Sequence, residues 1–421
     1  MSHAAPLDGL RVLEISSFVA SPLCGLTLAQ LGAEVIRIDP IGGAGDQHRW
    51  PLAPSGTSIY WTGLNKSKKS VTLNFRDPEG QRLVADLVAA SGPGGGIVVT
   101  NAVGRPWLGY DALASVRPDL IHLQVLGHHD GRAAVDYTIN AGLGFPMITG
   151  PEGHLGPVNH VLPAWDVACG LYAAVGVLSA ERHRRATGEG RRITLALEDV
   201  ALAVAGHLGF LAEAQLTGAD RPRIGNHLYG GFARDFATAD GGRVMVATVT
   251  GRHFADLAAA TGLAGPFAEL ERLLGADFAV DGDRYEHREV IASLLAPWFA
   301  GRDLAEIARG LAGTSVLWSP YRQFTDVVAG LVADGADGDD DGNGDGDGDD
   351  DGGLARNSML HQIDQPGVGP VLAAASPLDQ DGRLEPSPAS RLGADTADVL
   401  TGLLGLSAPQ IRDLAERGVT G

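Results

Sequence analysis

The chain has 421 residues, is 44% hydrophobic and carries a formal net charge of −19. This charge argues against a nucleic-acid partner, because such partners need a basic surface. No apolar run approaches the roughly 20 residues of a membrane-spanning helix, and the N-terminus lacks a basic region followed by an apolar stretch. The two cysteines, Cys24 and Cys169, fit a reducing compartment. We therefore expect a cytoplasmic protein, and the lack of a long apolar run predicts that it has no membrane partner.

Strand patterns alternate with helical patterns through the N-terminal part of the chain. The predicted strands are Arg11–Ile15, Glu34–Ile38, Ser70–Asn74, Gly96–Thr100 and Leu120–Gln124. The predicted helices are Leu23–Leu31, Glu79–Ala90 and Tyr110–Ser115. This alternation predicts an α/β fold with a parallel sheet and covering helices. A dinucleotide site is disfavoured, because no G-x-G-x-x-G motif follows the first strand.

A long helix is predicted from Ala164 to Arg185, and it ends in a charged run. Asp166 lies in its first turn, directly after Pro163, where unpaired backbone N–H groups and the helix dipole favour an anion. Two hypotheses fit this position: an aspartate that caps the helix, or a reactive carboxylate. The spacing alone favours capping.

The middle of the chain indicates a change of domain. Another helix is predicted over Leu195–Leu216, and a hairpin follows from two strands, Phe232–Thr238 and Arg243–Val249. We therefore predict that residues 1–222 form the N-terminal part of a large domain and that residues 223–325 form a smaller α+β domain. Residues 326–356 are then an insertion, and residues 357–421 return to the large domain.

An acidic tract dominates the predicted insertion. Between Asp334 and Gly353, ten of twenty residues are aspartates and most of the others are glycines. Such a tract repels itself and has nothing to bury, which predicts a disordered, solvated segment. Asp337–Gly342 fits the start of a calcium loop, but the closing glutamate and the flanking helices are missing. The linker hypothesis is therefore favoured, and no metal site is predicted.

Short segments along nearly the whole chain resemble the class III coenzyme A transferases, a family that includes α-methylacyl-CoA racemases. These segments are Leu7–Ser16, Ala20–Pro22, Leu28–Arg37, Asn65–Asn74, Thr187–Gly190, Tyr229–Asp235, Asp240–Gly241 and Arg391–Thr396. The resemblance implies a large Rossmann-like domain built from the N- and C-terminal parts, a smaller domain, and a homodimer of interlocked chains. It also implies that Asp166 is the catalytic residue.

Three further segments are most similar to the branch of this family that moves coenzyme A (CoA) between the two carboxyl groups of mesaconate. They are Val135–Asn140, Gly144–Pro151 and Val158–Asp166. This similarity implies that Asp166 attacks an acyl-CoA thioester to give a mixed anhydride and then an aspartyl-CoA thioester. CoA enters as part of the acyl-CoA substrate, and no permanently bound cofactor is expected.

The resemblance also implies which residues contact CoA. They are Val19, Ala20, Leu73, Asn74, Phe75, Arg76, Asn101, Ala102, Arg105 and Asp136. The lysine run Lys66, Lys68 and Lys69 suits the phosphates of CoA as well, although a solvated face is the commoner fate of such a run.

Other groups are candidates for the acyl part of the substrate. Arg132, Asn140 and His160 could bind a free carboxylate, while His160 equally fits a core histidine. The backbone N–H groups of Gly230 and Gly231 could stabilise an oxyanion, because glycine lets the backbone approach a reacting carbonyl closely. A bulge or turn at a domain boundary explains the glycine pair equally well.

Three other functions stay open. A transferase that exchanges CoA between two acids, such as succinate or another dicarboxylic acid, would use the same Asp166. A racemase needs bases on two faces of a carbon; Val135 stands where that branch has a histidine, although His128 and His129 lie upstream. A non-catalytic acyl-CoA-binding protein is the least compatible with Asp166.

Overall fold

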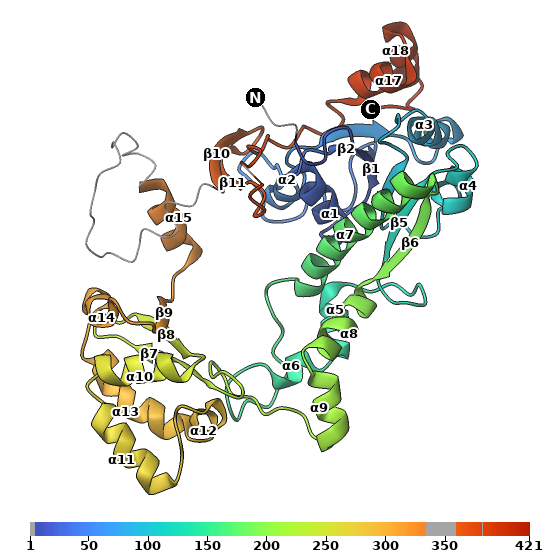
Figure 1. The fold of residues 1–421 in the computed structure, drawn as a ribbon. Helices are drawn as coiled ribbons and strands as arrows, with labels where there is room; N and C mark the ends of the chain where they lie inside the picture. Colours follow the sequence, from blue (N-terminus) through green and yellow to red (C-terminus); the bar gives the residue numbers. More distant parts are fainter. Residues whose placement is uncertain (1–4, 334–358, 381) are drawn as a thin grey trace. The chain divides into compact units, whose positions relative to one another are not determined.

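The computed structural model describes residues 5–333, 359–380 and 382–421, which form two compact units (Figure 1). The first unit consists of Met1–Phe145, Asn159–Ala219 and Ser358–Gly421. The second consists of Pro146–Val158 and Asp220–Asn357. The segment Pro146–Val158 is thus an excursion from the first unit into the second, which the predicted domain boundaries do not contain.

A six-stranded sheet forms the centre of the first unit, and its strands run in the order β3-β2-β1-β4-β5-β6. The strands are β1 (Arg11–Ile15), β2 (Glu34–Pro40), β3 (Lys69–Leu73), β4 (Ile97–Thr100), β5 (Ile121–Leu126) and β6 (Arg191–Ala196). All neighbouring pairs are parallel, so the predicted α/β class is confirmed. In a sheet of this order the chain reverses direction between β1 and β4, and ligands bind outside the carboxyl ends of the strands there.

Helices cover both faces of this sheet. They are α1 (Ala20–Ala29), α2 (Ile59–Leu64), α3 (Pro78–Ala89), the 3-10 turn η1 (Pro106–Leu108), α4 (Tyr110–Ala114), α5 (Asp136–Gly142), α7 (Ala164–Thr187), α8 (Leu197–His207) and α9 (Phe210–Thr217). The short α6 (Phe145–Ile148) lies where the two units divide. One apolar core holds residues of α1, α7 and α8, and a second core holds residues of α3 and α4.

The prediction of one helix over Leu195–Leu216 is wrong. The chain completes strand β6 at Ala196, forms α8, and breaks before α9 at Gly209, whose φ of 81° interrupts a right-handed helix. Strand β6 was missed because only one of its six residues is fully buried, so its sequence lacks a strong apolar pattern.

Helices α1 and α7 approach each other closely. A Cβ atom at Gly170 would lie 2.8 Å from the carbonyl oxygen of Ala20 and 3.0 Å from the Cβ of Leu23, so only glycine fits. The free, buried Cys24 and Cys169 lie on the same two helices. The N-terminus of α7 is therefore held against the start of α1, which follows β1.

The C-terminal part of the chain covers the outer edge of β3. It contributes β10 (Leu360–Gln365), β11 (Gly369–Ala374), α17 (Thr396–Leu404) and α18 (Ala408–Glu416). The backbone N–H groups of Ser70 and Thr72 donate to side chains of Asp395 and Thr396, and that of Asn74 donates to the carbonyl of Val419. The edge strand of the sheet is thus hydrogen-bonded along its free side.

The second unit contains an antiparallel sheet with the order β7-β8-β9 and a separate apolar core. Its elements are β7 (Phe232–Ala237), β8 (Arg243–Thr248), α10 (Gly251–Ala260), α11 (Ala264–Leu274), α12 (Asp281–Glu286), α13 (Arg288–Ala300), α14 (Leu304–Leu311), β9 (Leu317–Pro320) and α15 (Phe324–Ala333). Helix α15 shows that the predicted disordered insertion does not begin at residue 326. The acidic tract and the calcium hypothesis lie outside the described residues.

Among the described residues, no single helix is long and apolar enough to cross a membrane. Helices α8 and α9 reach such a length and composition only as a pair bent by 64°. Several residues of α8 belong to the core of the first unit, as expected for a core helix.

Candidate active site

The loop after β1 is fixed at the point where the sheet reverses direction. The side-chain amide of Asn101, which follows β4, donates to the carbonyl of Ser17 at 2.8 Å and accepts from its N–H at 3.1 Å. Val19 and Ala20 then begin α1 as buried residues, while Ala102 is half-buried. Four of the predicted CoA contacts therefore lie around this point, where the fold favours ligand binding.

The other predicted CoA contacts divide into buried and exposed groups. Leu73 is buried within β3, and the side-chain amide of Asn74 donates to the carbonyl of Gly418. Phe75 packs on Trp107 with ring centres 5.4 Å apart, and the Arg105 guanidinium lies 5.4 Å from the Phe75 ring. Both Arg76 and Arg105 are exposed. Contacts of Phe75, Arg76 and Arg105 with CoA stay a prediction.

The N-terminus of α7 is capped by Asp136, a residue of α5. One carboxylate oxygen, Oδ2, accepts from the backbone N–H groups of Trp165 at 2.7 Å and Asp166 at 3.2 Å. The other oxygen, Oδ1, lies 2.9 Å from Nε2 of His160. Because Asp136 supplies the anion that the first turn requires, the hypothesis that Asp166 is the cap is wrong. A contact between Asp136 and CoA stays a prediction.

The carboxylate of Asp166 has no hydrogen-bond donor among the residues that the structure describes. Its pKa is raised to about 6, mainly by burial and also by the charge of Asp136, while the cation of Arg49 opposes both effects. Burial also raises the pKa of Tyr60 to about 12, and Arg49 and Asp166 act on that group as well. Arg49 and Tyr60 were not predicted, since neither lies in a segment that the spacing of motifs distinguishes.

The three residues predicted to bind a substrate carboxylate already have partners. Asn140 is buried, accepting from the indole N–H of Trp165 at 3.1 Å and donating to Asn159. Arg132 is exposed and donates to Asp130 at 2.7 Å. His160 is held by Asp136, yet about a quarter of its side chain is exposed. The structure therefore brings Asn140 and His160 to α7, whereas Arg132 forms a local surface pair.

The histidines that a racemase could use are also paired. His128 and His129 face Glu198 and Asp199 at the start of α8, at 3.2 and 2.9 Å. Val135 precedes α5 and is mostly exposed.

Gly230 and Gly231 belong to the second unit and directly precede β7. Gly230 has a φ of 76°, which glycine adopts readily, and the N–H of Gly231 lies 3.5 Å from the carbonyl of Leu228. The pair therefore forms a turn. Their action on an oxyanion stays a prediction.

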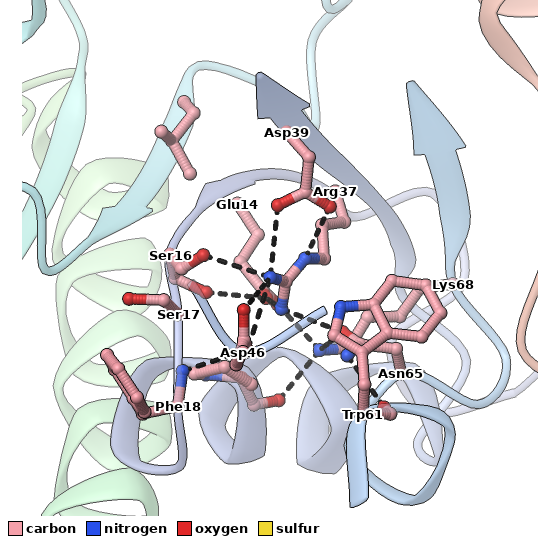
Figure 2. A network of polar contacts seen from close by, with 12 residues as sticks. Glu14, Ser16, Ser17, Phe18, Arg37, Asp39, Asp46, Trp61, Asn65 and Lys68 are labelled. Atoms are coloured by element: carbon pink, nitrogen blue, oxygen red, sulfur yellow. Dashed lines mark hydrogen bonds and ion pairs between the residues drawn. The ribbon is translucent and has the colours of Figure 1, made fainter. Parts of the chain in front are cut away.

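A buried network of charged and polar side chains joins the first strands to the loops at their carboxyl ends (Figure 2). Its members are Glu14, Ser16, Arg37, Asp39, Asp46, Asn65 and Lys68. The Arg37 guanidinium donates to both oxygens of Asp39, at 2.8 and 3.0 Å, and to Asp46 at 3.3 Å. The ammonium of Lys68 donates to Glu14 at 2.8 Å.

The network corrects our interpretation of the lysine run. Lys68 is buried, so it is neither part of a solvated face nor accessible to the phosphates of CoA. Burial lowers its pKa, and Glu14 opposes that shift. The neighbouring Lys69 is half-exposed and pairs with Glu34, while Lys66 donates to the carbonyl of Thr62.

Asp46 carries the network to the loop after β1. Its Oδ2 accepts from the N–H of Phe18 at 2.9 Å. Phe18 has a φ of 67°, which is strained for a bulky residue and persists only where the surroundings hold it. Its ring is exposed in part and faces Arg49, with the guanidinium 5.6 Å from the ring centre.

The site contains a free carboxylate at a helix N-terminus, next to an aromatic and cationic surface. Among the described residues, no group of three His, Cys, Asp or Glu side chains could hold a metal ion. A sequence profile described as CoA-transferase family III matches residues 7–333. The chain belongs to this family. The resemblance noted from the sequence is thereby confirmed, and the transferase is an enzyme.

The chain is similar to known proteins over most of its length. It is 46% identical, over 98% of its own length and 97% of the relative's, to 2-methylfumaryl-CoA isomerase of Chloroflexus aurantiacus. It is 32% identical, over 70% of its own length and 72% of the relative's, to succinyl-CoA–D-citramalate CoA-transferase of the same organism. A CAIB/BAIF family protein from Brucella suis has the same fold, with a TM-score of 0.74 and 25% identity over 95% of this chain and 100% of that chain.

The raised pKa of Asp166 predicts a stability effect that depends on pH. The transferase loses stability as the pH rises through about 6, because ionised Asp166 is disfavoured in the folded state. We expect Asp166→Asn to stabilise the folded protein by at most about 3 kcal/mol above pH 7, and to change little below pH 4. Urea unfolding across this range measures the difference. An effect of equal size at pH 4 and pH 8 would contradict the prediction.

Lys68 and Glu14 form a buried ion pair, and removing one of them should lower the free energy of unfolding strongly. Lys68→Met removes the cation that donates to Glu14 at 2.8 Å and leaves that carboxylate only one cation, Arg37, at the longer distance of 3.5 Å, so we expect the transferase to lose about 3–5 kcal/mol of its free energy of unfolding. Lys69→Met is the matched control, since its exposed pair with Glu34 contributes about 1 kcal/mol or less. Urea unfolding of both variants makes the comparison; losses of similar size would show that the network is not coupled to folding.

Proposed function

We propose that the chain transfers CoA between the two carboxyl groups of mesaconyl-CoA within one molecule, with Asp166 as the nucleophile. The state of Asp166 carries this proposal: its carboxylate is partly buried, accepts no hydrogen bond from the described residues, and has a pKa raised by burial to about 6. The 46% identity with a 2-methylfumaryl-CoA isomerase supports the choice of substrate.

The environment of Asp166 suits a carboxylate that must be acylated. At neutral pH most of the group is ionised and can attack a carbonyl carbon. Acylation removes its charge, so burial and the neighbouring Asp136, which disfavour the anion, favour the acylated form. Because Asp136 caps α7, the free carboxylate of Asp166 is not needed for the stability of the helix.

The proposed sequence needs no cofactor and no net proton transfer. An oxygen of Asp166 bonds to the thioester carbon, the C–S bond breaks, and CoA departs as a thiolate. The acyl group is then joined to Asp166 as a mixed anhydride. The thiolate then attacks the aspartyl carbonyl and releases mesaconate as a dianion. Mesaconate then rotates end for end within the site. Its other carboxylate attacks the aspartyl thioester, and the same steps run in reverse. Backbone N–H groups of Gly230 and Gly231 are our proposal for stabilising the oxyanions.

A second candidate is an intermolecular transferase that exchanges CoA between two dicarboxylic acids. The 32% identity with a succinyl-CoA–D-citramalate CoA-transferase favours it, and Asp166 would act in the same way. A racemase has less support, because Val135 cannot serve as a base and His128 and His129 are paired at α8.

We also propose that the chain acts as a homodimer in the cytoplasm. Apolar side chains of α7, α8 and α9 are exposed: Leu171, Tyr172, Val175, Leu202, Leu211 and Leu216. A partner chain would cover such a surface. Interlocking of the chains remains implied by the resemblance. Both cysteines are free, which suits a reducing compartment.

The dimer predicts a defined mass in solution. Sedimentation equilibrium should give twice the mass of one chain, and Val175→Asp should shift the equilibrium toward the monomer because it introduces a charge into the apolar surface. Val116→Asp, at an exposed position outside this surface, is the control. A wild-type protein that stays monomeric would exclude the dimer.

The intramolecular reaction predicts isomerisation without an added acid. Purified protein should convert mesaconyl-CoA into its positional isomer, as followed by chromatography and mass spectrometry, and Asp166→Ala should abolish the conversion. The rate should fall as the pH drops below about 6, because protonated Asp166 cannot attack. Labelled free mesaconate should not enter the product. If conversion requires a second acid, the intermolecular candidate is correct.

A further inference from the structure

Arg49 is a cation without an anionic partner beside the candidate nucleophile. Its guanidinium forms no ion pair and no hydrogen bond with the residues that the structure describes. It lies on two aromatic rings instead, with its Cζ 4.8 Å from the ring centre of Tyr60 and 5.6 Å from that of Phe18. Stacking on aromatic faces fixes the plane of a guanidinium while its N–H donors remain available.

Arg49 lies on the side of the fold where Asp166 begins α7: it stacks on Phe18, two residues before Ala20, and Ala20 contacts α7 at Gly170, one turn after Asp166. Burial raises the pKa of Asp166 and that of Tyr60, and in both cases the cation of Arg49 opposes the shift. Arg49, Tyr60 and Asp166 therefore lie close enough to interact near the N-terminus of α7. A carboxylate bound between Arg49 and Asp166 would contact both the cation and the nucleophile.

The backbone of Arg49 is held in place on both sides. Its N–H donates to the carbonyl of Asp46 at 3.1 Å, and its carbonyl accepts from the hydroxyl of Ser58 at 2.5 Å. The carboxylate of Asp46 belongs to the buried network that also holds Phe18. The guanidinium thus rests on a rigid base although the side chain itself is exposed.

The other groups considered for a substrate carboxylate are engaged. Arg132 donates to Asp130, Asn140 is enclosed by Trp165 and Asn159, and His160 is held by Asp136. Arg49 is the cation that these contacts leave available beside Asp166.

We propose that Arg49 binds the free carboxylate of a dicarboxylyl-CoA and thereby selects this class of substrate. The inference rests on the proposed function and names the group that recognises the end of the acyl chain opposite the thioester. A guanidinium suits this task, because its planar donors match both oxygens of a carboxylate.

The assignment gives Arg49 the same task in both halves of the reaction. While Asp166 attacks the thioester at one end, Arg49 holds the carboxylate at the other end. When the CoA thiolate has moved to Asp166, mesaconate carries two charges, and Arg49 keeps the dianion in the site while it turns. The carboxylate that was reacting then binds Arg49, and the carboxylate that was bound attacks the aspartyl thioester.

The test compares two acyl-CoA substrates that differ by one carboxylate. Mesaconyl-CoA carries it and crotonyl-CoA lacks it, while both require Asp166. Acylation of Asp166 is measured in single turnovers by trapping with hydroxylamine and mass spectrometry of the chain. We expect Arg49→Gln to lower the rate with mesaconyl-CoA about 10- to 100-fold, the range for a hydrogen bond between charged groups, and to leave the lower rate with crotonyl-CoA within about threefold.

Two further variants complete the experiment. Arg49→Lys keeps the charge and should recover part of the rate with mesaconyl-CoA. Arg82→Gln removes an exposed arginine of α3 that pairs with Glu79, and it should change neither rate. Labelled mesaconate should exchange into the product only with Arg49→Gln, because the dianion then leaves the site.

The outcomes separate the two proposals. Equal losses of rate with both substrates would show that Arg49 acts through Asp166, and no loss with either would show that Arg49 has no effect. Either result overturns the assignment of Arg49 and leaves the proposed function standing. Absence of Asp166 acylation in the wild-type protein overturns the proposed function and this inference with it. If the wild-type protein reacts only with mesaconyl-CoA, the assignment requires that Arg49→Gln removes this reaction and that Arg49→Lys restores part of it.

Discussion

The buried pairing of Arg37 and Lys68 with the carboxylates around them is the constraint on which the candidate site depends. It joins β1, β2 and the loops at their carboxyl ends, and through Asp46 it holds both Phe18 and the base of Arg49. Buried ion pairs contribute little net stability compared with apolar packing. Here the ion pairs orient the strands and loops that they join, because a guanidinium donates hydrogen bonds, and a carboxylate accepts them, in only a few directions.

Two aspartates at one helix N-terminus divide the tasks between them. Asp136 is fully buried and hydrogen-bonded, and it satisfies the backbone donors of α7. Asp166 has no donor among the described residues, and burial together with the charge of Asp136 raises its pKa. Two carboxylates in one environment thus acquire different properties, as acid–base pairs in enzymes commonly do. Gly170, one turn further along α7, permits the close contact with α1 that keeps this terminus beside the loop after β1.

Much of this could be predicted from the sequence. The first five strands and α7 carry strong apolar patterns, and the resemblance identified the family and predicted a catalytic role for Asp166. Strand β6 could not be predicted, because its residues are mostly exposed. The capping role of Asp136 and the position of Arg49 depend on contacts between elements far apart in the chain, which no local pattern records. Lys68 looked like a surface residue because composition cannot reveal that Glu14 lies opposite.

The hydrogen bonds along the free side of β3 bear on how the chain folds during synthesis. The bond from Ser70 to Asp395 spans 325 residues. A chain emerging from the ribosome therefore completes the first three strands long before their cover exists, and β3 is an open sheet edge throughout that time. Open edges pair with other chains. The nascent protein is thus most prone to aggregation before residues 395–420 have been made, and chaperone binding in that interval would protect the edge.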